Sequence, residues 1–372
     1  MRTLTVLPAP PASQGGATDR CAIALLLGLR GHGIDAAAIA PDLRGSWPGD
    51  AAELGVERVA VEAGGGITAR LSHLRRPLGD LSRTALLDAV RDAARTSDLL
   101  HLEGSLTTWL DEGTLLPSVM SLHYRAGLDR SGLAPWRTEG RELLLFRGLE
   151  RRAIRRHRWL VASSDGVASS ITAERRDVDV TVVPLSLDPA AYPEAPLDGP
   201  PVAGMIGTAA WPPTLDALRR LLRDVWPAVR ERMPSARLAL AGRGMANVVR
   251  TDHTAGVEVL GEVASSQAFL RDLSVLLYPV GRGSGMKVKV LEAIACGVPV
   301  VTTAAGAEGL SASDGVVVCE DDGAMVDAVM GLLADPGERR ERGVAARRLF
   351  LECYAPGPAT EPLVALYRRI LG

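Results

Sequence analysis

The sequence is poor in aromatic residues and carries no excess of either charge. Aromatic side chains make up 4% of the 372 residues, whereas hydrophobic residues together make up 47%. The bulk of the core must therefore come from Leu, Val, Ile and Ala, which suits buried parallel strands covered by helices. The 42 Lys+Arg residues nearly balance the 44 Asp+Glu residues, for a net charge of −2. This balance argues against a dedicated nucleic-acid binder, which needs a basic field.

Cysteine pairs and long apolar runs are also missing. The four cysteines are far apart and form no CxxC pair: Cys21, Cys296, Cys319 and Cys353. A zinc site or a disulfide framework is therefore not expected, and reduced thiols in a cytoplasmic protein fit better. No run approaches the roughly 20 apolar residues of a membrane span, and the apolar start of the chain is too short for a signal peptide. We therefore expect a soluble protein without an integral membrane segment.

Short apolar runs alternate with helical patterns along most of the chain. In the N-terminal half, strands are expected at residues 4–7, 34–40, 99–102, 118–122, 159–162 and 180–184, with helices notably at 18–29, 82–95 and 138–156. In the C-terminal half, strands are expected at 202–206, 237–241, 257–260, 275–278, 298–302 and 316–319, with helices at 214–232, 286–295, 323–334 and 337–350. Strands that alternate with helices indicate α/β units with parallel sheets.

The alternation stops over residues 184–201, which are rich in Pro, Asp and Ala and show no periodicity. We therefore predict an N-terminal Rossmann-like domain over residues 1–186, a linker over 187–200 and a C-terminal Rossmann-like domain over 201–354. A cleft that faces the carboxyl ends of both sets of strands is the expected ligand site.

The most informative segment is a glycine-rich loop between a strand and a helix. It reads Gly283, Ser284, Gly285, Met286 and Lys287. Glycines let backbone N–H groups approach a ligand closely, and the following helix adds a partial positive charge, so the loop suits an anion. Lys287 and Lys289 are expected in the first helical turn, where cations are unfavourable unless a negative ligand offsets the helix dipole. Glu292 follows in the same helix, within reach of ribose hydroxyls. The alternative is a glycine turn with solvated lysines.

This segment resembles the donor-binding segment of GT-B glycosyltransferases in the large retaining family 4. The resemblance is to the branch that carries G-S-G-M-K-x-K-V-L-E-A, and the chain matches it over residues 283–287, 289–293, 297–303 and 306–310. Residues 207–218 resemble the opening of the family's C-terminal domain. Arg243 and Val263 belong to segments that resemble its nucleotide-side segments, the second of which lies beside the base. The resemblance implies the GT-B fold and a nucleotide-diphosphate sugar as co-substrate, a UDP-sugar first, with GDP and dTDP left open.

The resemblance also assigns roles in donor binding. Lys287 and the loop 283–285 would hold the diphosphate with Lys289, helped by Arg243 or Arg282, and Glu292 would hold the ribose. Gly15 and Gly16 resemble the family's first loop, whose amides face the phosphates, although a tight turn is the alternative. Many family members carry two glutamates eight positions apart, and Ser284 stands at the first of these positions. A carboxylate next to the sugar is therefore not carried over.

The N-terminal half offers candidates for the sugar and acceptor side. Residues 121–124 end a strand as a D-x-H-N-like segment does in related enzymes, which would place His123 near the donor sugar as a catalytic residue, although a lone histidine is more often structural. Ser121 and Tyr124 depart from that pattern. His101 and Glu103 close another strand, and we expect them, with Tyr124, on the acceptor side.

The resemblance implies sugar transfer with retention, in which the leaving phosphate takes the acceptor's proton. Amide dipoles and lysines stabilise such a leaving group without a metal, so no metal or other cofactor is expected. The acceptor is a small molecule or a glycan. The C-terminal helix, within residues 355–372, is expected to return to the N-terminal domain, as such helices often do in this fold.

Other interpretations concern the membrane and the chemistry. One helix and the residues after it carry a run of basic side chains: Arg147, Arg151, Arg152, Arg155, Arg156 and Arg158. This run favours either a solvated face or peripheral contact with anionic lipid. A nucleotide-sugar epimerase, a pseudo-glycosyl coupling enzyme and a non-catalytic nucleotide-sugar-binding module stay open. An NAD-dependent dehydrogenase is excluded because no GxGxxG follows the first strand.

Overall fold

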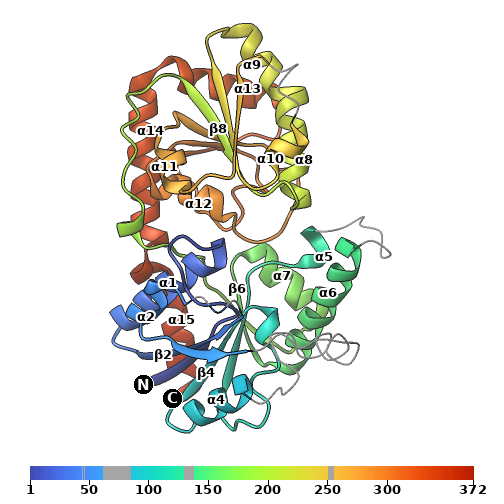
Figure 1. Ribbon diagram of the computed structural model, residues 1–372, viewed down its shortest axis with the longest axis vertical. Helices are drawn as coiled ribbons and strands as arrows, with labels where there is room; N and C mark the ends of the chain where they lie inside the picture. The colour runs from blue at the N-terminus through green and yellow to red at the C-terminus, as the bar shows by residue number, and fades with distance from the viewer. Residues whose placement is uncertain (44, 46, 62–84, 130–137, 250–254) are drawn as a thin grey trace. The chain divides into compact units, whose positions relative to one another are not determined.

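The structure is a computed structural model that describes residues 1–43, 45, 47–61, 85–129, 138–249 and 255–372. The chain divides into two compact units. The first comprises Met1–Gly127, Ser131–Asp188 and Pro356–Gly372, and the second comprises Leu128–Arg130 and Pro189–Ala355. Each unit is an α/β domain built on one parallel sheet (Figure 1). This confirms the fold class that the alternation of strands and helices predicts.

The first unit contains a seven-stranded sheet in the order β3-β2-β1-β4-β5-β6-β7. Its strands are β1 (Arg2–Val6), β2 (Asp35–Asp42), β3 (Glu57–Ala60), β4 (Leu99–Glu103), β5 (Ser118–Leu122), β6 (Trp159–Ala162) and β7 (Asp179–Val182). Its helices are α1 (Ala17–Gly31), α2 (Gly49–Glu53), α4 (Ala85–Ala94), α6 (Thr138–Arg156), α7 (Asp165–Glu174) and α15 (Pro356–Leu371), with a 3₁₀ turn at Ser105–Thr107. The short helix α5 (Ala126–Asp129) leads into the segment that belongs to the second unit.

Two apolar clusters cover the two faces of this sheet. One joins the strands to α4, α6 and α7, and the other joins them to α1 and α15. Figure 1 shows α15, the red C-terminal helix, beside the blue α1. The two helices approach closely at Gly28, where an added Cβ would collide with the Pro356 carbonyl oxygen and with Thr360. The last helix of the chain is therefore a structural part of the first unit.

The second unit contains a six-stranded parallel sheet in the order β10-β9-β8-β11-β12-β13. Its strands are β8 (Val202–Ile206), β9 (Arg237–Ala241), β10 (Val257–Gly261), β11 (Val275–Tyr278), β12 (Val300–Thr302) and β13 (Val316–Val318). Its helices are α8 (Pro212–Arg220), α9 (Trp226–Arg232), α10 (Met245–Val248), α11 (Ser266–Arg271), α12 (Val288–Ala295), α13 (Asp322–Ala334) and α14 (Pro336–Leu349), with a 3₁₀ turn at Pro189–Ala191. Single π turns occupy Leu221–Val225 and Phe350–Tyr354.

The structure differs from the sequence prediction at two helices of this unit. The helix expected over 214–232 consists of α8 and α9 joined by the π turn, because Pro227 lacks the N–H that would continue a regular ladder. The helix expected to begin at Met286 begins at Val288, and Lys287 is its N-cap residue with extended backbone angles. Lys287 therefore lies just before the first helical turn and not within it.

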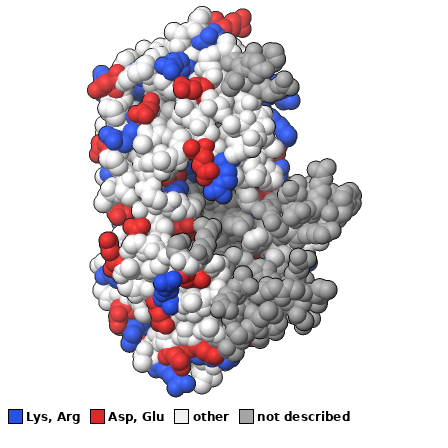
Figure 2. Space-filling view, viewed as in Figure 1, with Lys and Arg blue, Asp and Glu red and all other residues white. Residues whose placement is uncertain are grey.

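The charged side chains are mixed over the surface. Figure 2 shows acidic and basic residues interspersed over the visible face. No helix within the described ranges is both long and apolar enough to cross a membrane.

Candidate active site

The centre of the second sheet is where its strand order reverses. The neighbours β8 and β11 lead into connections on opposite sides of the sheet, and ligands of such folds bind outside the carboxyl ends of these strands. The loop after β8 starts at Gly207 and packs against the loop after β9. A Cβ added to Gly242 would collide with the Gly207 carbonyl, and one added to Gly207 would lie 2.9 Å from Lys289 Nζ. Both glycines are therefore needed for close backbone contact beside a lysine.

The loop after β11 turns through two glycines. Gly283 and Gly285 have φ angles of 122° and 70°, which side-chain-bearing residues rarely adopt. Between them, Ser284 donates from its backbone N–H and from its hydroxyl to Asp129 Oδ1, over 2.6 and 2.7 Å. Asp129 belongs to the Leu128–Arg130 segment of the second unit and is 3% exposed. The loop thus holds a carboxylate oxygen.

Burial raises the pKa of Asp129, although the bonds from Ser284 and the charge of Lys287 favour its ionised form. The ammonium of Lys287 donates to the Gly285 carbonyl over 2.5 Å and lies 3.6 Å from Glu308 Oε2. Its pKa is lowered because burial removes water from the charge, and the carboxylates of Glu308 and Asp129 only partly compensate. A partly desolvated cation therefore stands beside the loop amides.

The second lysine lies deeper in the fold. Lys289 Nζ donates to Thr214 Oγ1 over 2.9 Å and to Tyr278 OH over 3.2 Å, and it stands 4.7 Å from the centre of the Tyr278 ring. Lys287 and Lys289 are the only lysines in the sequence, whose other basic residues, histidines aside, are all arginines. This restriction of lysine to the start of α12 is a signal that the sequence carries for this site.

Glu292 lies inside α12 and is 4% exposed. Its Oε1 accepts hydrogen bonds from Tyr192 OH over 3.1 Å and from Ser266 Oγ over 2.8 Å. Tyr192 follows the turn at Pro189–Ala191, and Ser266 begins α11. These two donors satisfy a buried carboxyl group and hold it in one orientation.

The remaining donor-side residues fall in different surroundings. Arg282 binds Asp216 Oδ2 through two nitrogens, over 2.9 and 2.7 Å, and also donates to the Asp129 carbonyl over 2.8 Å. Arg243 pairs with Glu262 at 3.3 Å, and its side chain is 75% exposed. Met286 is buried, and Val263 lines a hollow of about 640 Å³ beside β10 and α11.

In the first unit, Gly15 and Gly16 precede α1, and both amides already have acceptors within this unit. Gly15 N–H donates to the Ala12 carbonyl over 3.0 Å, and Gly16 N–H donates to Asp19 Oδ2 over 2.8 Å. A Cβ on Gly15 would lie 2.6 Å from Asp19 Oδ2. The glycines form a tight helix entry, and their role toward a donor stays a prediction.

The carboxyl ends of β4 and β5 carry a buried polar network. His101 and Glu103 lie on β4, in register with Val119 and Ser121 of β5, and His123 follows β5. His123 Nε2 lies 2.6 Å from Glu103 Oε2. Ser121 Oγ donates to Glu103 Oε1 over 2.8 Å. The structure thus brings the predicted residues His123, His101 and Glu103 together.

His101 lies behind Glu103 and is 1% exposed. Its Nε2 is 2.7 Å from Ser121 Oγ and 2.9 Å from Glu103 Oε1, and its Nδ1 is 2.5 Å from the hydroxyl of Tyr367 on α15. Both ring nitrogens of His101 are therefore occupied within the protein. Tyr124, the other residue expected on the acceptor side, is half-buried.

Electrostatics in this network favour an ion pair. Burial alone would raise the pKa of Glu103, but the charge of His123 and the hydrogen bonds from His101 and His123 lower it. Burial opposes the charged form of His123, yet the Glu103 carboxylate raises the pKa of its imidazole. Both shifts favour the charged forms of the pair, a carboxylate beside an imidazolium.

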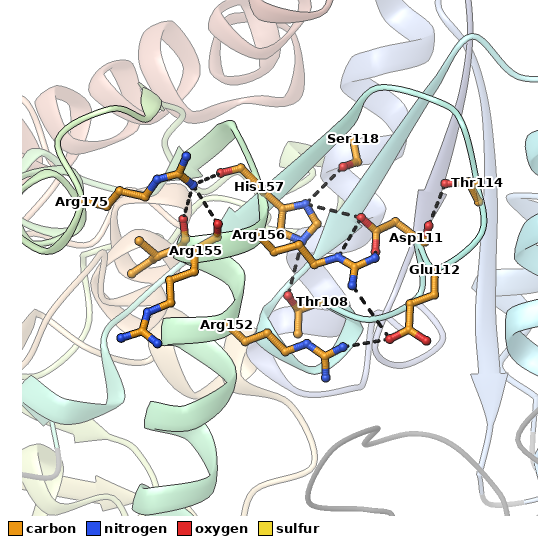
Figure 3. Close-up of polar contacts among 11 residues, drawn as sticks. Thr108, Asp111, Glu112, Thr114, Ser118, Arg152, Arg155, Arg156, His157 and Arg175 are labelled. Carbon is orange, nitrogen blue, oxygen red and sulfur yellow. Dashed lines mark hydrogen bonds and ion pairs between the residues drawn. The ribbon is translucent and has the colours of Figure 1, made fainter.

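The basic helix α6 forms ion pairs with the loop between β4 and β5 (Figure 3). Arg152 binds Glu112 over 2.8 Å, and Arg156 binds Asp111 over 2.6 Å. Four arginines and one glycine line a hollow of about 560 Å³ on this helix: Gly148, Arg151, Arg152, Arg155 and Arg156. Two of these four arginines are thus already paired with acidic side chains.

His157 and Arg175 make polar contacts at the C-terminal end of α6 (Figure 3). The His157 ring is buried between the hydroxyls of Ser118 and Thr108, at 3.1 and 3.4 Å, and this burial lowers its pKa. Arg175 donates to the carbonyl oxygens of Ile154, Arg155 and His157 at the end of the helix. These contacts give this part of the basic run a structural role.

Comparison with known proteins found a family match within the second unit. Residues 200–335 match the family model described as glycosyl transferases group 1. A search of curated protein sequences found no match. The family match and the shared fold indicate a transferase.

Solved structures share the fold across the whole chain. A TarM mutant of S. aureus, in complex with fondaparinux, alpha-GlcNAc-glycerol and UDP, superposes with a TM-score of 0.71 at 10% identity, over 98% of this chain and 99% of that one. HepE of Anabaena, in complex with UDP and glucose, gives 0.68 at 14% identity, over 99% of both chains. The pneumococcal O-GlcNAc transferase GtfA, in complex with UDP and GlcNAc, gives 0.65 at 10% identity, over 100% and 99%. At these identities the likeness establishes the GT-B fold.

Proposed function

We propose that the protein transfers a sugar from a nucleotide-diphosphate sugar, a UDP-sugar first, to a small-molecule or glycan acceptor. The observation that carries this proposal is the loop after β11, where the Ser284 amide and hydroxyl hold a carboxylate oxygen. Two glycines with positive φ shape this loop, and the ammonium of Lys287 stands beside it. An amide and a hydroxyl that hold one anion, with a cation beside them, suit the oxygens of another anion, and a diphosphate carries several.

The same groups suit the chemistry of sugar transfer. The bond between the anomeric carbon and the phosphate oxygen breaks, the bond to the acceptor oxygen forms, and a phosphate oxygen takes the acceptor's proton. Negative charge builds on the departing diphosphate, where the loop amides and Lys287 are already oriented to stabilise it. We propose that this stabilisation needs no metal ion and that attack on the same face as the leaving group retains the anomeric configuration.

Glu292 is the proposed ribose ligand. A carboxylate accepts hydrogen bonds from neighbouring hydroxyls, and Tyr192 and Ser266 hold this one in place. Support for uracil as the base comes from the three neighbouring structures described above, each of which contains UDP. Peripheral contact with an anionic membrane through the arginine-lined hollow on α6 is a further part of the proposal, supported by the four arginines that line this hollow.

Thermal unfolding with a panel of nucleotides tests the donor site. UDP, GDP, ADP, dTDP and their sugars are each compared on the wild type and on Lys287→Ala. A ligand at about 100 times its Kd adds roughly 2.7 kcal/mol, which raises the Tm by a few degrees. We expect stabilisation by UDP and its sugars that Lys287→Ala abolishes. Arg340→Ala, a change at a surface ion pair with Asp198, is the matched control and should leave the shift intact.

Turnover is tested separately. UDP release with a UDP-sugar is followed with and without a panel of glycan acceptors, and the product's anomeric configuration is determined by NMR. Acceptor-dependent mass gain supports transfer. Conversion of the donor sugar without mass gain would replace the proposal with an epimerase, and binding without any turnover would replace it with a nucleotide-sugar-binding module. An absence of stabilisation by every nucleotide would overturn the donor site itself.

A further inference from the structure

The hydrogen bonds around Glu103 have a determined direction. Ser121 Oγ has one proton and gives it to Glu103 Oε1, so it accepts from His101 Nε2. His101 therefore carries its proton on Nε2, and its Nδ1 accepts from the Tyr367 hydroxyl. Burial raises the pKa of Tyr367 well above its ordinary value, which agrees with a phenol that keeps its proton. Glu103 Oε1 consequently receives donors from Ser121 and His101.

This arrangement leaves Glu103 Oε2 for His123. The His123 Nε2 lies 2.6 Å from that oxygen, and Ser163 Oγ donates to the His123 carbonyl over 2.6 Å from the end of β6. A residue of β4 thus bonds the His123 ring, and a residue that follows β6 bonds the His123 backbone. The other ring nitrogen, Nδ1, is buried and has no hydrogen-bond partner within the described residues. Buried polar atoms in folded proteins almost always have a partner, so this atom is a candidate to bind a ligand.

We infer that Glu103 is a positioning residue, which holds the His123 ring through Nε2 and keeps it positively charged, so that Nδ1–H is offered to an oxygen atom of the ligand. Glu103 itself lies behind His123 and contacts no ligand. Ser121 and His101 donate to Oε1 of this carboxylate and orient it. The inference rests on the proposed function for the identity of the ligand, a sugar hydroxyl or a phosphate oxygen.

The network joins distant parts of the chain. Tyr367 is 266 residues from His101 and comes from α15, which packs beside α1. The groups that face the His123–Glu103 pair are accordingly His101 and Glu103 on β4, Ser121 on β5, Ser163 after β6 and Tyr367 on α15. Within this set Glu103 supplies the charge that acts on the His123 ring.

Histidine NMR tests the inference without any substrate. The sequence contains six histidines, so the ring signals of labelled protein can be assigned with single variants. We expect His123 to titrate above the ordinary histidine value of 6.5 in the wild type and at a lower pH in Glu103→Gln. Tyr367→Phe, which removes a buried hydroxyl from the same network, is the matched control and should leave the His123 titration near that of the wild type.

Several outcomes would overturn the inference. One is a wild-type His123 that titrates at or below the ordinary value, a result that needs no variant. A second is an unchanged His123 titration in folded Glu103→Gln, and a third is an equal shift in Tyr367→Phe. If Glu103→Gln does not fold, Glu103→Asp replaces it; it keeps the charge but shortens the reach, and we expect a smaller shift in the same direction.

Kinetics then connects the pair to the reaction. Activity that needs imidazolium is present below its pKa and is lost as the pH rises through it. In Glu103→Gln the alkaline limb of kcat/KM should therefore move to lower pH, and kcat/KM at neutral pH should fall about 10- to 100-fold, as expected for loss of a hydrogen bond to a charged group. If no transfer is found with any donor, the proposed function fails while the NMR result still decides the role of Glu103.

Discussion

The hydroxyl of Tyr192 donates a hydrogen bond to Oε1 of Glu292, 100 residues later in the chain, over 3.1 Å. Tyr192 is 1% exposed and comes from the segment that opens the second unit, whereas Glu292 lies inside α12. The residues expected to form a linker thus contribute a side chain to the proposed donor site. Their contribution is orientation, because the tyrosine hydroxyl occupies one oxygen of the carboxyl group.

Tyr192→Phe should weaken UDP binding about fivefold. The change removes one hydrogen bond to a buried carboxyl group, worth about 1 kcal/mol, and leaves the bond from Ser266 in place. Isothermal titration with UDP measures the loss. Because the proposed role of Glu292 concerns the ribose, the affinity for inorganic diphosphate should not change in this variant.

The comparison with diphosphate separates orientation from general damage. Tyr367→Phe removes another buried tyrosine hydroxyl, in the first unit, and serves as the control with unchanged UDP affinity. A Tyr192→Phe variant that loses UDP and diphosphate affinity equally would show that the loop itself is disturbed, contrary to the assignment of Glu292 to the ribose.

Lys287 should lose its proton at a lower pH than an ordinary lysine. Burial lowers the pKa of its ammonium, and Glu308, 3.6 Å away, opposes that shift. Reductive methylation with ¹³C-formaldehyde labels only two lysines and the amino terminus, so the titration of each can be followed by NMR. The affinity for UDP should fall as the pH rises through the Lys287 titration, because the cation that faces the diphosphate is lost.

The variant Glu308→Gln tests whether the Glu308 carboxylate raises the pKa of Lys287. Removal of the carboxylate should lower the pKa of Lys287 further and shift the loss of UDP affinity to lower pH, whereas Lys287→Arg should abolish the pH dependence because arginine stays charged. Titration of Lys287 at the ordinary lysine value would contradict the assignment of a desolvated cation.

The sequence predicts most strands of both sheets because a strand depends on a local pattern of apolar residues. Strands at 118–122, 159–162, 202–206 and 237–241 lie at the predicted residues, where apolar runs are bounded by polar and turn-forming residues. Strand β3 was not predicted because two of its four residues, Glu57 and Arg58, are charged and leave no apolar run. Helix α7 was also missed, although Ser164 caps it through the Val167 N–H, a signal that the sequence does carry.

Contacts between side chains that are far apart in the sequence could not be predicted. The proximity of Glu103 and His123 follows from the register of β4 and β5, which a single sequence does not specify. Tyr367 and His101 are 266 residues apart, and Asp129 and Ser284 are 155 residues apart. Neither pair has a local pattern, because each depends on long-range packing. The roles of the donor-site residues stay predictions until binding is measured.

Gly28→Ala should loosen the C-terminal helix. The added methyl group would collide with the Pro356 carbonyl and lie 2.5 Å from Thr360 Oγ1, and overpacking of this kind costs about 1–3 kcal/mol. Hydrogen exchange of the α15 amides should accelerate, and the free energy of unfolding in urea should fall. Gly31→Ala, in the same helix with no atom within 4 Å of the new Cβ, should be neutral or stabilising by up to about 1 kcal/mol. Equal effects of the two changes would contradict a close packing of α15 on α1.

Asp129→Asn should tighten UDP binding about three- to tenfold. The Asp129 carboxylate holds the Ser284 amide that we assign to the diphosphate, so a donor must displace it, and the amide of asparagine is a weaker acceptor without charge. Burial raises the pKa of Asp129, so acidification neutralises it earlier than an ordinary aspartate. The difference in UDP affinity between wild type and variant should therefore narrow as the pH falls.

Weaker UDP-sugar binding in Asp129→Asn would instead assign Asp129 to the sugar site. Ser284 stands where many relatives of the resembled family carry a glutamate, and Asp129 places a carboxylate 2.7 Å from its hydroxyl. If Asp129→Asn weakens UDP-sugar binding or lowers kcat while UDP affinity is unchanged, the carboxylate is part of the sugar site and does not compete with the donor. Titration of both proteins with UDP and with the UDP-sugar, at two pH values, separates the two roles. A carboxylate that competes with the diphosphate changes the affinity for both compounds, whereas a carboxylate that binds the sugar changes only the affinity for the UDP-sugar.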